Sequence, residues 1–543
     1  MLPIRASLIV FGIVASSFAM ADEAFFESRI RPVLIKHCYE CHSETADVVQ
    51  AGLRLDAANK MLAGGDSGPV IVPGDPDASM LIRSLKYEEI EMPPAGPLDK
   101  KIIRDFETWI EQGAFDPRAD AEPNEDAVVA EIDWNEAREF WAFQPPKEHP
   151  LPETHHRLES GNWIDRFVGA RLESEGLKPN RAADRWTLIR RVTFDLTGLP
   201  PSAEEVDRFV VDQHPAAYER LVDRLLSSPG QGEHWTRLWL DVARYAEDQA
   251  HIVGNNDSLI YPNAYLYRDW AVDAFAGDMP YDEFIKMQLA ADVIAPNDRE
   301  AHLALGFLGL GPKYYRRGAP EVMADEWEDR IDTVTRGLLG LTVACARCHD
   351  HKYDPIETED YYALAGVFAG TEMFNRPLND SVKKKGKDAE KPQDAAHILR
   401  EGNPRDLNVM LRGDVNRKGD VVPRRFLRAL SSDEPRSLSR GSGRVDLAEA
   451  IVDTSNPLTA RVIVNRVWRK LMGSGFVETP SNFGLLGEMP SHPQLLDTLA
   501  VRFMREGWSL KWLQREIVLS GTYRQSGVAS TRAMDVDPAN RLF

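Results

Sequence analysis

The chain has 543 residues, of which 43% are hydrophobic, and 12 tryptophans are spread along its length. A chain this long exceeds what one hydrophobic core normally organises and predicts roughly three or four domains. The formal net charge is −20, and a field of that sign repels nucleic acid and anionic membrane surfaces. Composition and charge therefore predict a folded, multidomain protein that does not bind nucleic acid, and they name no substrate.

The first residues have the pattern of an export signal. Arg5 precedes an apolar stretch at 7–19, and Ala19, Met20 and Ala21 form the small–x–small pattern of a signal-peptidase site. Such a stretch is too short to span a bilayer. We therefore expect residues 1–21 to be a cleaved signal peptide, with an uncleaved anchor as the alternative. The mature protein is then periplasmic or otherwise extracytoplasmic, with no stable membrane insertion.

All four cysteines occur in two copies of the pattern C-x-x-C-H, which attaches c-type haem. The copies are residues 38–42, with Cys38, Cys41 and His42, and residues 345–349, with Cys345, Cys348 and His349. On a helix, thiols at i and i+3 share a face and reach the vinyl groups of one haem, and a histidine at i+4 can bind its iron. We therefore predict two covalent haem c groups, with the four cysteines as attachment sites and the two histidines as iron ligands.

Other uses of paired cysteines explain this pattern less well. A structural disulfide would suit an oxidising compartment, and a thioredoxin-like pair also uses C-x-x-C. Neither use requires a histidine after both pairs. A zinc site would need the two pairs to converge from distant parts of the chain, or further ligands around each pair.

Residues 24–115 predict a small haem domain like class I cytochrome c. Apolar residues at helical spacing lead into the first motif, and an amphipathic helix is expected at 101–113. Between them, Met92 precedes Pro93 and Pro94, which hold an extended loop. A methionine before such a loop is typical of the sixth iron ligand of small cytochromes. We therefore assign Met92 to the iron, with Met80 as the rival.

The remainder of the chain predicts a mainly α fold with two further, mostly helical domains. Residues 116–160 are acidic and contain prolines, and they predict a solvated linker whose aromatic residues dock on the next domain. We expect a helical domain at 161–375, which carries the second haem motif. A linker at 376–420, with a hairpin near 408–422, precedes a helical C-terminal domain at 421–543.

Several side chains near the second motif are candidates for catalysis. His351 follows the proximal ligand by two positions, which on a helix turns it away from the same iron. It could therefore bridge to a substrate, to a haem propionate or to a carboxylate such as Asp350, which is a candidate itself. Asp241 and Arg244 lie at i and i+3, and they either form a surface ion pair or line a polar pocket. If the iron has a sixth ligand, the candidates are His234, His251, His302 and Met373.

The chain resembles the secreted planctomycete cytochrome c family, in which a small cytochrome domain precedes two larger domains of unknown function. The matching segments are residues 38–94, 186–200, 239–245, 341–355, 456–468, 479–484 and 508–510. In two respects the chain departs from the family pattern. The family's last domain usually continues past the element at 537–542, so we expect a truncated third domain here, and Phe140 stands where the family often has histidine.

The motifs and the resemblance together predict a secreted di-haem cytochrome that transfers electrons. The resemblance implies, as an expectation, oxidation of an extracytoplasmic substrate such as a carbohydrate, with a redox partner protein or a dehydrogenase as the partner. Two alternatives stay open, a di-haem peroxidase with an open second iron and a non-catalytic electron-carrying scaffold for a separate dehydrogenase. A carbohydrate hydrolase is less well supported, because no carboxylate pair is singled out in so acidic a chain.

Overall fold

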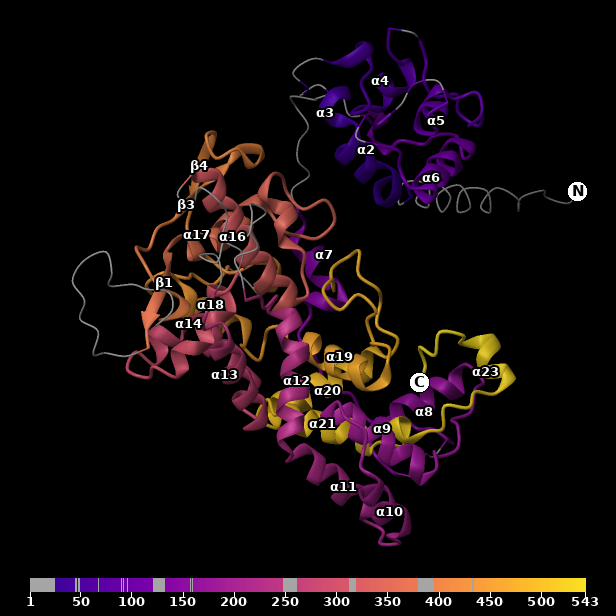
Figure 1. Cartoon of the computed structure of the whole chain (residues 1–543), viewed down its shortest axis with the longest axis vertical. Helices are drawn as coiled ribbons and strands as arrows, with labels where there is room; N and C mark the ends of the chain where they lie inside the picture. Colours follow the sequence, from indigo (N-terminus) through magenta and orange to yellow (C-terminus); the bar gives the residue numbers. More distant parts are fainter. Residues whose placement is uncertain are drawn as a thin grey trace, which may run out of the picture. The chain divides into compact units, whose positions relative to one another are not determined.

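The computed structural model describes residues 25–120, 132–247, 261–311, 319–378 and 395–543, apart from 44, 45, 47, 48, 67, 89, 91, 95, 157, 159, 432 and 433. The chain divides into two compact units, residues 1–131 and 132–543, which are described separately. The described residues are mainly helical, as predicted, with two small antiparallel sheets (Figure 1). The predicted signal peptide, residues 1–21, lies outside the described residues.

The first unit is a small helical domain whose first and last helices pack together. In chain order its elements are η1 (Phe26–Ile30), α2 (Arg31–His37), α3 (Tyr39–His42), η2 (Gln50–Gly52), α4 (Ala58–Ala63), α5 (Met80–Leu85), α6 (Lys100–Glu111) and η3 (Pro117–Asp120). Asp99 caps α6 by accepting a hydrogen bond from Lys101 N at 2.7 Å. The buried face of α6 meets η1, where the rings of Trp109 and Phe26 lie 5.6 Å apart.

The second unit contains both of the larger predicted domains. Its elements up to the first sheet are α7 (Trp134–Glu139), η4 (Trp141–Phe143), α8 (Ile164–Ser174), α9 (Arg185–Thr197), α10 (Ala203–Val211), α11 (Ala217–Leu226), α12 (Pro229–Val242), α13 (Tyr265–Ala276), α14 (Tyr281–Ile294), η6 (Ala301–Leu305), α15 (Gly306–Gly309), α16 (Pro320–Val334), η7 (Thr335–Leu339), η8 (Val343–Arg347) and α17 (Thr358–Ala369). Aromatic side chains dominate the centre of its core, where Trp239 stacks on Phe307.

Two hairpins follow α17. Strands β3 (Leu407–Met410) and β4 (Lys418–Val422) pair antiparallel, which confirms the hairpin predicted near 408–422. Strands β1 (Thr371–Pro377) and β2 (Ala395–Glu401) also pair antiparallel. The sequence analysis missed this second pair, because neither strand alternates polar and apolar residues.

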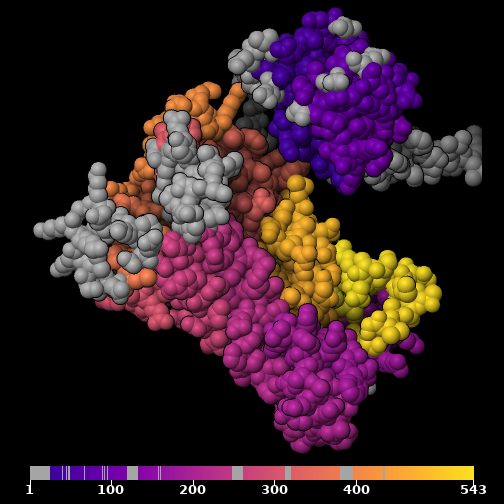
Figure 2. All heavy atoms as spheres, in the orientation of Figure 1, coloured from indigo at the N-terminus to yellow at the C-terminus, as the bar shows by residue number. Residues whose placement is uncertain are grey.

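The C-terminal part of the second unit is helical, as predicted. Its elements are η10 (Leu411–Gly413), η11 (Arg428–Leu430), α18 (Arg444–Ile451), α19 (Thr459–Met472), α20 (Pro493–Arg505), α21 (Leu510–Leu519), α22 (Gly521–Arg524) and α23 (Thr531–Val536). Residues from 527 onward lie largely at the surface, where they form the yellow region in Figure 2.

Buried charged side chains join distant segments of this unit. The carboxylate of Asp165 in α8 accepts hydrogen bonds from the backbone N–H groups of Gly521 and Thr522 at 2.9 and 2.8 Å. Arg444, fully buried in α18, donates to the Leu289 carbonyl at 3.0 Å and pairs with Asp292 at 2.8 Å. Because a buried charge is costly unless it is paired and hydrogen-bonded, these contacts fix how the two helical regions pack.

Residues 132–156 do not form the solvated linker that the sequence predicted. Ala142 and Phe143 are buried in the core of the second unit. Arg461 of α19 donates to the Gln144 carbonyl at 2.6 Å and pairs with Asp497 at 2.7 Å. Acidic composition and prolines predicted exposure. The aromatic residues dock on the unit as expected, and their burial holds the neighbouring backbone against it.

No helix within the described ranges combines the length and the apolar character that crossing a bilayer requires.

One buried histidine should make the second unit sensitive to acid. Burial, with a smaller effect from Arg171, lowers the pKa of His492 to about 3, and its ring packs 5.4 Å from that of Phe543. Between pH 6.5 and 3 the unfolded chain binds a proton that the folded chain excludes, so stability falls as the pH falls. At pH 5 this group should have removed about 2 kcal/mol.

Urea unfolding followed by tryptophan fluorescence tests this prediction. Between pH 7 and pH 5, His492→Phe should lose about 2 kcal/mol less stability than the wild type. The exposed His155→Phe variant controls for the removal of a histidine. Identical losses in wild type and His492→Phe would show that His492 is not the group responsible.

Candidate functional site

The first C-x-x-C-H motif continues the helix that begins the first unit. Helix α2 ends at His37, Cys38 departs from helical geometry, and α3 spans the rest of the motif. The backbone N–H of His42 donates to the Cys38 carbonyl at 2.9 Å, so one helical turn still places both cysteines and the histidine on one side. Burial raises the pKa of the Cys38 thiol to about 11.

The His42 imidazole is oriented by one hydrogen bond. Its Nδ1 lies 3.2 Å from the Leu53 carbonyl oxygen. A carbonyl only accepts hydrogen bonds, so Nδ1 carries the proton and Nε2 keeps its lone pair. A second hydrogen bond, from Leu55 N to the His42 carbonyl at 2.8 Å, fixes the backbone segment at 53–55 against the motif. This is the arrangement by which a protein presents Nε2 of a histidine to a metal.

The motif opens into an apolar cavity of about 420 Å³. Both cysteines, His42, Met80 and Met92 line it. The other lining side chains include Leu53, Leu55, Val70, Leu81, Leu85 and Ile90. Two thiols, an imidazole with a free nitrogen and two thioethers in one apolar cavity are the donor set and the surroundings that a haem c requires. The residues present therefore fit that group.

The Met92 loop is tied back to the domain beside the cavity. Met92 N donates to the Ser84 carbonyl at 3.4 Å, and the Tyr87 hydroxyl donates to the Pro93 carbonyl. Met80 reaches the same cavity from the start of α5. Both the assigned sixth ligand and its rival thus line the cavity beside the motif.

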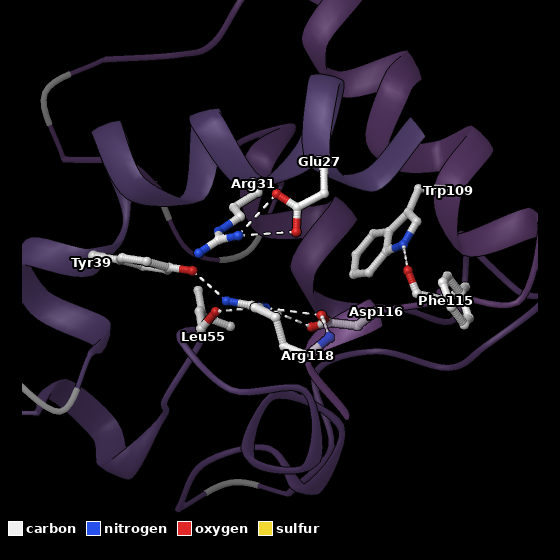
Figure 3. A network of polar contacts seen from close by, with 8 residues as sticks. All are labelled: Glu27, Arg31, Tyr39, Leu55, Trp109, Phe115, Asp116 and Arg118. Atoms are coloured by element: carbon white, nitrogen blue, oxygen red, sulfur yellow. Dashed lines mark hydrogen bonds and ion pairs between the residues drawn. The ribbon is translucent and has the colours of Figure 1, made fainter. Parts of the chain in front are cut away.

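A polar network behind the motif fastens the end of the first unit to it (Figure 3). The Arg118 guanidinium donates to the hydroxyl of Tyr39, which lies between the two cysteines, and to the Leu55 carbonyl at 3.3 Å. Its charge is balanced by the buried Asp116, at 2.6 Å. Residues 116–118, predicted to begin a solvated linker, instead stabilise the backbone that orients His42.

The second C-x-x-C-H motif has a different backbone. We predicted a helix with both thiols and the histidine on one face, but residues 343–347 form the 3-10 helix η8, and Cys348 ends it. The cause is Gly340, whose left-handed φ of 61° terminates the preceding helix shortly before the motif. Cys345 and Cys348 nevertheless line the same depression.

The second motif lines an open depression of about 670 Å³, most of whose lining residues are polar or charged. Cys345, Cys348 and His349 are all exposed, and His349 Nδ1 lies 2.7 Å from the Asp350 carbonyl oxygen, which leaves Nε2 as its free nitrogen. Four cationic side chains share the lining with Glu328, namely Arg336, Arg347, Lys352 and Arg412. Arg347 already pairs with Asp325 and Glu328, and Arg336 pairs with Asp332. Two thiols, a free imidazole nitrogen and cations suited to the carboxylates of haem propionates fit a haem c with one face toward solvent.

The described cysteines show neither of the competing uses. All four are free thiols. Within the described ranges, no three or more His, Cys, Asp or Glu side chains are grouped so as to hold a metal ion. The zinc and disulfide interpretations therefore find no support in the arrangement of these residues.

His351 and Asp350 support the loop that follows the second motif. His351 is buried, and its Nδ1 accepts hydrogen bonds from the backbone N–H groups of Asp354 and Tyr353 at 2.8 and 3.3 Å. Burial lowers the pKa of His351 and raises the pKa of the adjacent Asp354, so it favours the neutral form of both. Asp350 accepts hydrogen bonds from Thr358 N and Oγ1 at 2.8 and 3.0 Å, at the start of α17.

Asp241 and Arg244 do not pair with one another. Asp241 pairs with Arg237 one turn earlier in α12, and Arg244 pairs with Asp329 of α16. The reason is that α12 ends at Val242, and Arg244 has a φ of 48°, which points its side chain away from the helical register. Both residues nevertheless line one depression of about 620 Å³.

The candidate sixth ligands of the second iron lie elsewhere. His234, His302 and Met373 are not among the residues that line the second depression, and His302 is buried with Nε2 2.9 Å from the Ala295 carbonyl. His251 falls outside the described residues. The sequence offered no signal for the four cations around the motif, because they come from three separate segments.

Three family models match the chain in the predicted order. Planctomycete cytochrome C matches residues 38–96, a protein of unknown function (DUF1549) matches 163–373, and a protein of unknown function (DUF1553) matches 443–543. The chain belongs to the planctomycete cytochrome c family. No curated protein and no solved structure matches it.

Membership settles the class of the first site. A planctomycete cytochrome C domain makes the chain a c-type cytochrome of the electron-transfer kind, with covalent haem c implied at Cys38 and Cys41. Cytochromes of this class are typically extracytoplasmic. The two larger matched domains carry no stated activity.

Replacing the assigned sixth ligand should change the spectrum and potential of the first haem. Met92→Leu removes the thioether but keeps an apolar side chain in the cavity, so the thioether-to-iron charge-transfer absorption should vanish. The midpoint potential should fall by on the order of 0.1 V, a fraction of the span that axial ligands control. Redox titration with optical spectroscopy measures both changes.

Met80→Leu is the matched control, because Met80 lines the same cavity. It should keep the absorption band and shift the potential far less. If Met80→Leu loses the band and Met92→Leu keeps it, Met80 is the ligand and the Met92 assignment is wrong.

Proposed function

We propose that this chain is a secreted di-haem c-type cytochrome that transfers electrons from an extracytoplasmic substrate to a redox partner. One observation carries the proposal: in each C-x-x-C-H motif the two thiols and the histidine line a single depression. Residues 1–21 would act as the cleaved export signal. A carbohydrate is the substrate class that the family resemblance suggests, and a dehydrogenase is one candidate partner.

The first site suits electron relay. When bound, haem c supplies one-electron transfer. The protein's own contribution is to hold the His42 imidazole through the Leu53 carbonyl, to offer a thioether from Met92, and to keep water out with an apolar lining. A thioether ligand and an apolar environment both favour a high potential. The first site is therefore suited to accept electrons.

The second site suits contact with a substrate or a partner. Its thiols and His349 are exposed, and its lining is polar and cationic. Exposure to solvent and ligand identity are the variables by which a protein sets the potential and the access of a haem. A chain that has one apolar haem site and one open haem site is consistent with entry of electrons at the open site and relay through the apolar one.

A peroxidase-like activity is the second candidate. It is favoured by the observation that no methionine, and no histidine other than His349 and His351, lines the second depression. His351 is held by backbone hydrogen bonds. Among the described residues that line this depression, the only histidines are thus His349 and the hydrogen-bonded His351, and an iron held there without a Met or a second His ligand would be accessible to a small ligand.

The number of covalent haems per chain tests the main proposal. Expressed in a host with c-type haem maturation and then denatured, the wild type should carry two haems by its pyridine haemochrome absorbance. Cys345→Ser/Cys348→Ser and Cys38→Ser/Cys41→Ser should each carry one, because covalent attachment needs the thiols. One haem in the wild type, unchanged in the Cys345→Ser/Cys348→Ser variant, would contradict the di-haem proposal.

Cyanide titration distinguishes electron transfer alone from peroxidase-like chemistry. We expect cyanide to change the absorption spectrum of one haem of the two, and to change neither in the Cys345→Ser/Cys348→Ser variant. A wild type that does not bind cyanide at the second haem would exclude an open iron and with it the peroxidase-like alternative.

A further inference from the structure

Another depression, the one that Asp241 and Arg244 line, lies next to the depression that holds the second haem motif. It has a volume of about 620 Å³, and Arg336 lines both depressions. The loop at 480–482 also separates them, since Pro480 and Ser481 line one and Asn482 lines the other. A molecule bound in this depression would therefore share Arg336 with the depression that holds Cys345, Cys348 and His349.

The lining of this depression is strongly cationic in a chain whose net charge is −20. Five basic side chains, Arg244, Arg336, Arg466, Arg469 and Lys470, face two carboxylates, those of Asp241 and Asp332. Both carboxylates are already paired, Asp241 with Arg237 and Asp332 with Arg336 at 2.5 Å. Among the described residues, Arg466, Arg469 and Lys470 form no ion pair, so the depression keeps an excess of positive charge.

The hydrogen bonds of Arg466 are the observation that points to a bound anion. Its guanidinium donates to the carbonyl oxygens of Gly337, of Arg336 at 2.8 Å and of Pro480 at 3.3 Å. These bonds fix the group in place but supply no negative charge, and burial lowers its pKa. Arg466 is half-buried, and a charge that is partly removed from water is costly unless it is paired. Three carbonyl contacts account for three of its five N–H donors, which leaves two for an external acceptor.

We propose that this depression binds an oxyanion, the carboxylate, sulfate or phosphate group of a small substrate that is presented to the second haem motif. Arg466 would be the fixed guanidinium at its base, and Arg469 and Lys470 would supply mobile charge from the end of α19. Low-dielectric walls around like charges concentrate the field and raise the local concentration of an anionic ligand. The anion site stands on these residues alone, whereas its role as a substrate site rests on the function proposed above.

The test uses inorganic sulfate and the full-length protein in a buffer of low anion concentration. Sulfate should bind saturably to the wild type by isothermal titration calorimetry. Arg469→Gln/Lys470→Gln should weaken binding about ten-fold, since two charge-assisted contacts are lost. Arg220→Gln/Arg224→Gln removes the same charge from exposed positions on α11 and should bind as the wild type does. Thermal melts in sulfate-free buffer confirm that all three proteins are folded.

Three results would overturn the anion site. These are no saturable binding of sulfate, phosphate or acetate to the wild type, equal binding by Arg469→Gln/Lys470→Gln, and equal weakening in the α11 control, which would make the effect one of net charge. The Cys345→Ser/Cys348→Ser chain separates this proposal from the previous one. Sulfate binding by a chain that carries one haem supports the anion site even where the di-haem function fails. Two haems in a chain that does not bind sulfate support the di-haem function and contradict the anion site.

Discussion

The second haem motif depends on hydrogen bonds from residues that follow it far along the chain. Phe483 N donates to the Gly340 carbonyl at 2.7 Å, just before the motif, and Leu485 N donates to Asp354 Oδ1 at 2.7 Å, just after it. The fit is close, since a Cβ at Gly484 would lie 2.2 Å from the same carboxylate oxygen. The loop that carries Cys345 and Cys348 is therefore held at both ends by the region that matches the third family model.

This dependence explains why the two larger domains form one compact unit. A Cβ at Gly413 would lie 2.6 Å from Cys348 Sγ, and the Tyr362 hydroxyl donates to the carbonyls of both Arg347 and Met410, at 2.9 and 3.3 Å. An exposed motif without regular helix has few contacts of its own to fix its thiols. The supporting residues supply that rigidity from outside, which is how a site on a loop attains a defined geometry.

The two motifs share a sequence pattern but not a local environment. In the first, a helical turn and the Leu53 carbonyl present His42 to an apolar cavity. In the second, a 3-10 turn presents His349 to an open, cationic depression. Enclosure and ligand type set the potential of a haem, and exposure sets its access. The difference between the two sites follows from the backbone around each motif and not from the motif itself.

The sequence by itself determined the features that depend on local order. Two C-x-x-C-H patterns, the helix periodicity, the Met92 loop and the hairpin near 408–422 could all be predicted, because the residues that cause each of them lie within a few positions of one another. Only the tertiary structure decided the 3-10 geometry of residues 343–347, the packing of residues 132–156 and the separate partners of Asp241 and Arg244. It also assembled the depression around Arg466 from helices α12, α16 and α19. Burial and charge pairing between distant segments determine these features. A local sequence pattern does not indicate which distant side chain will be the partner.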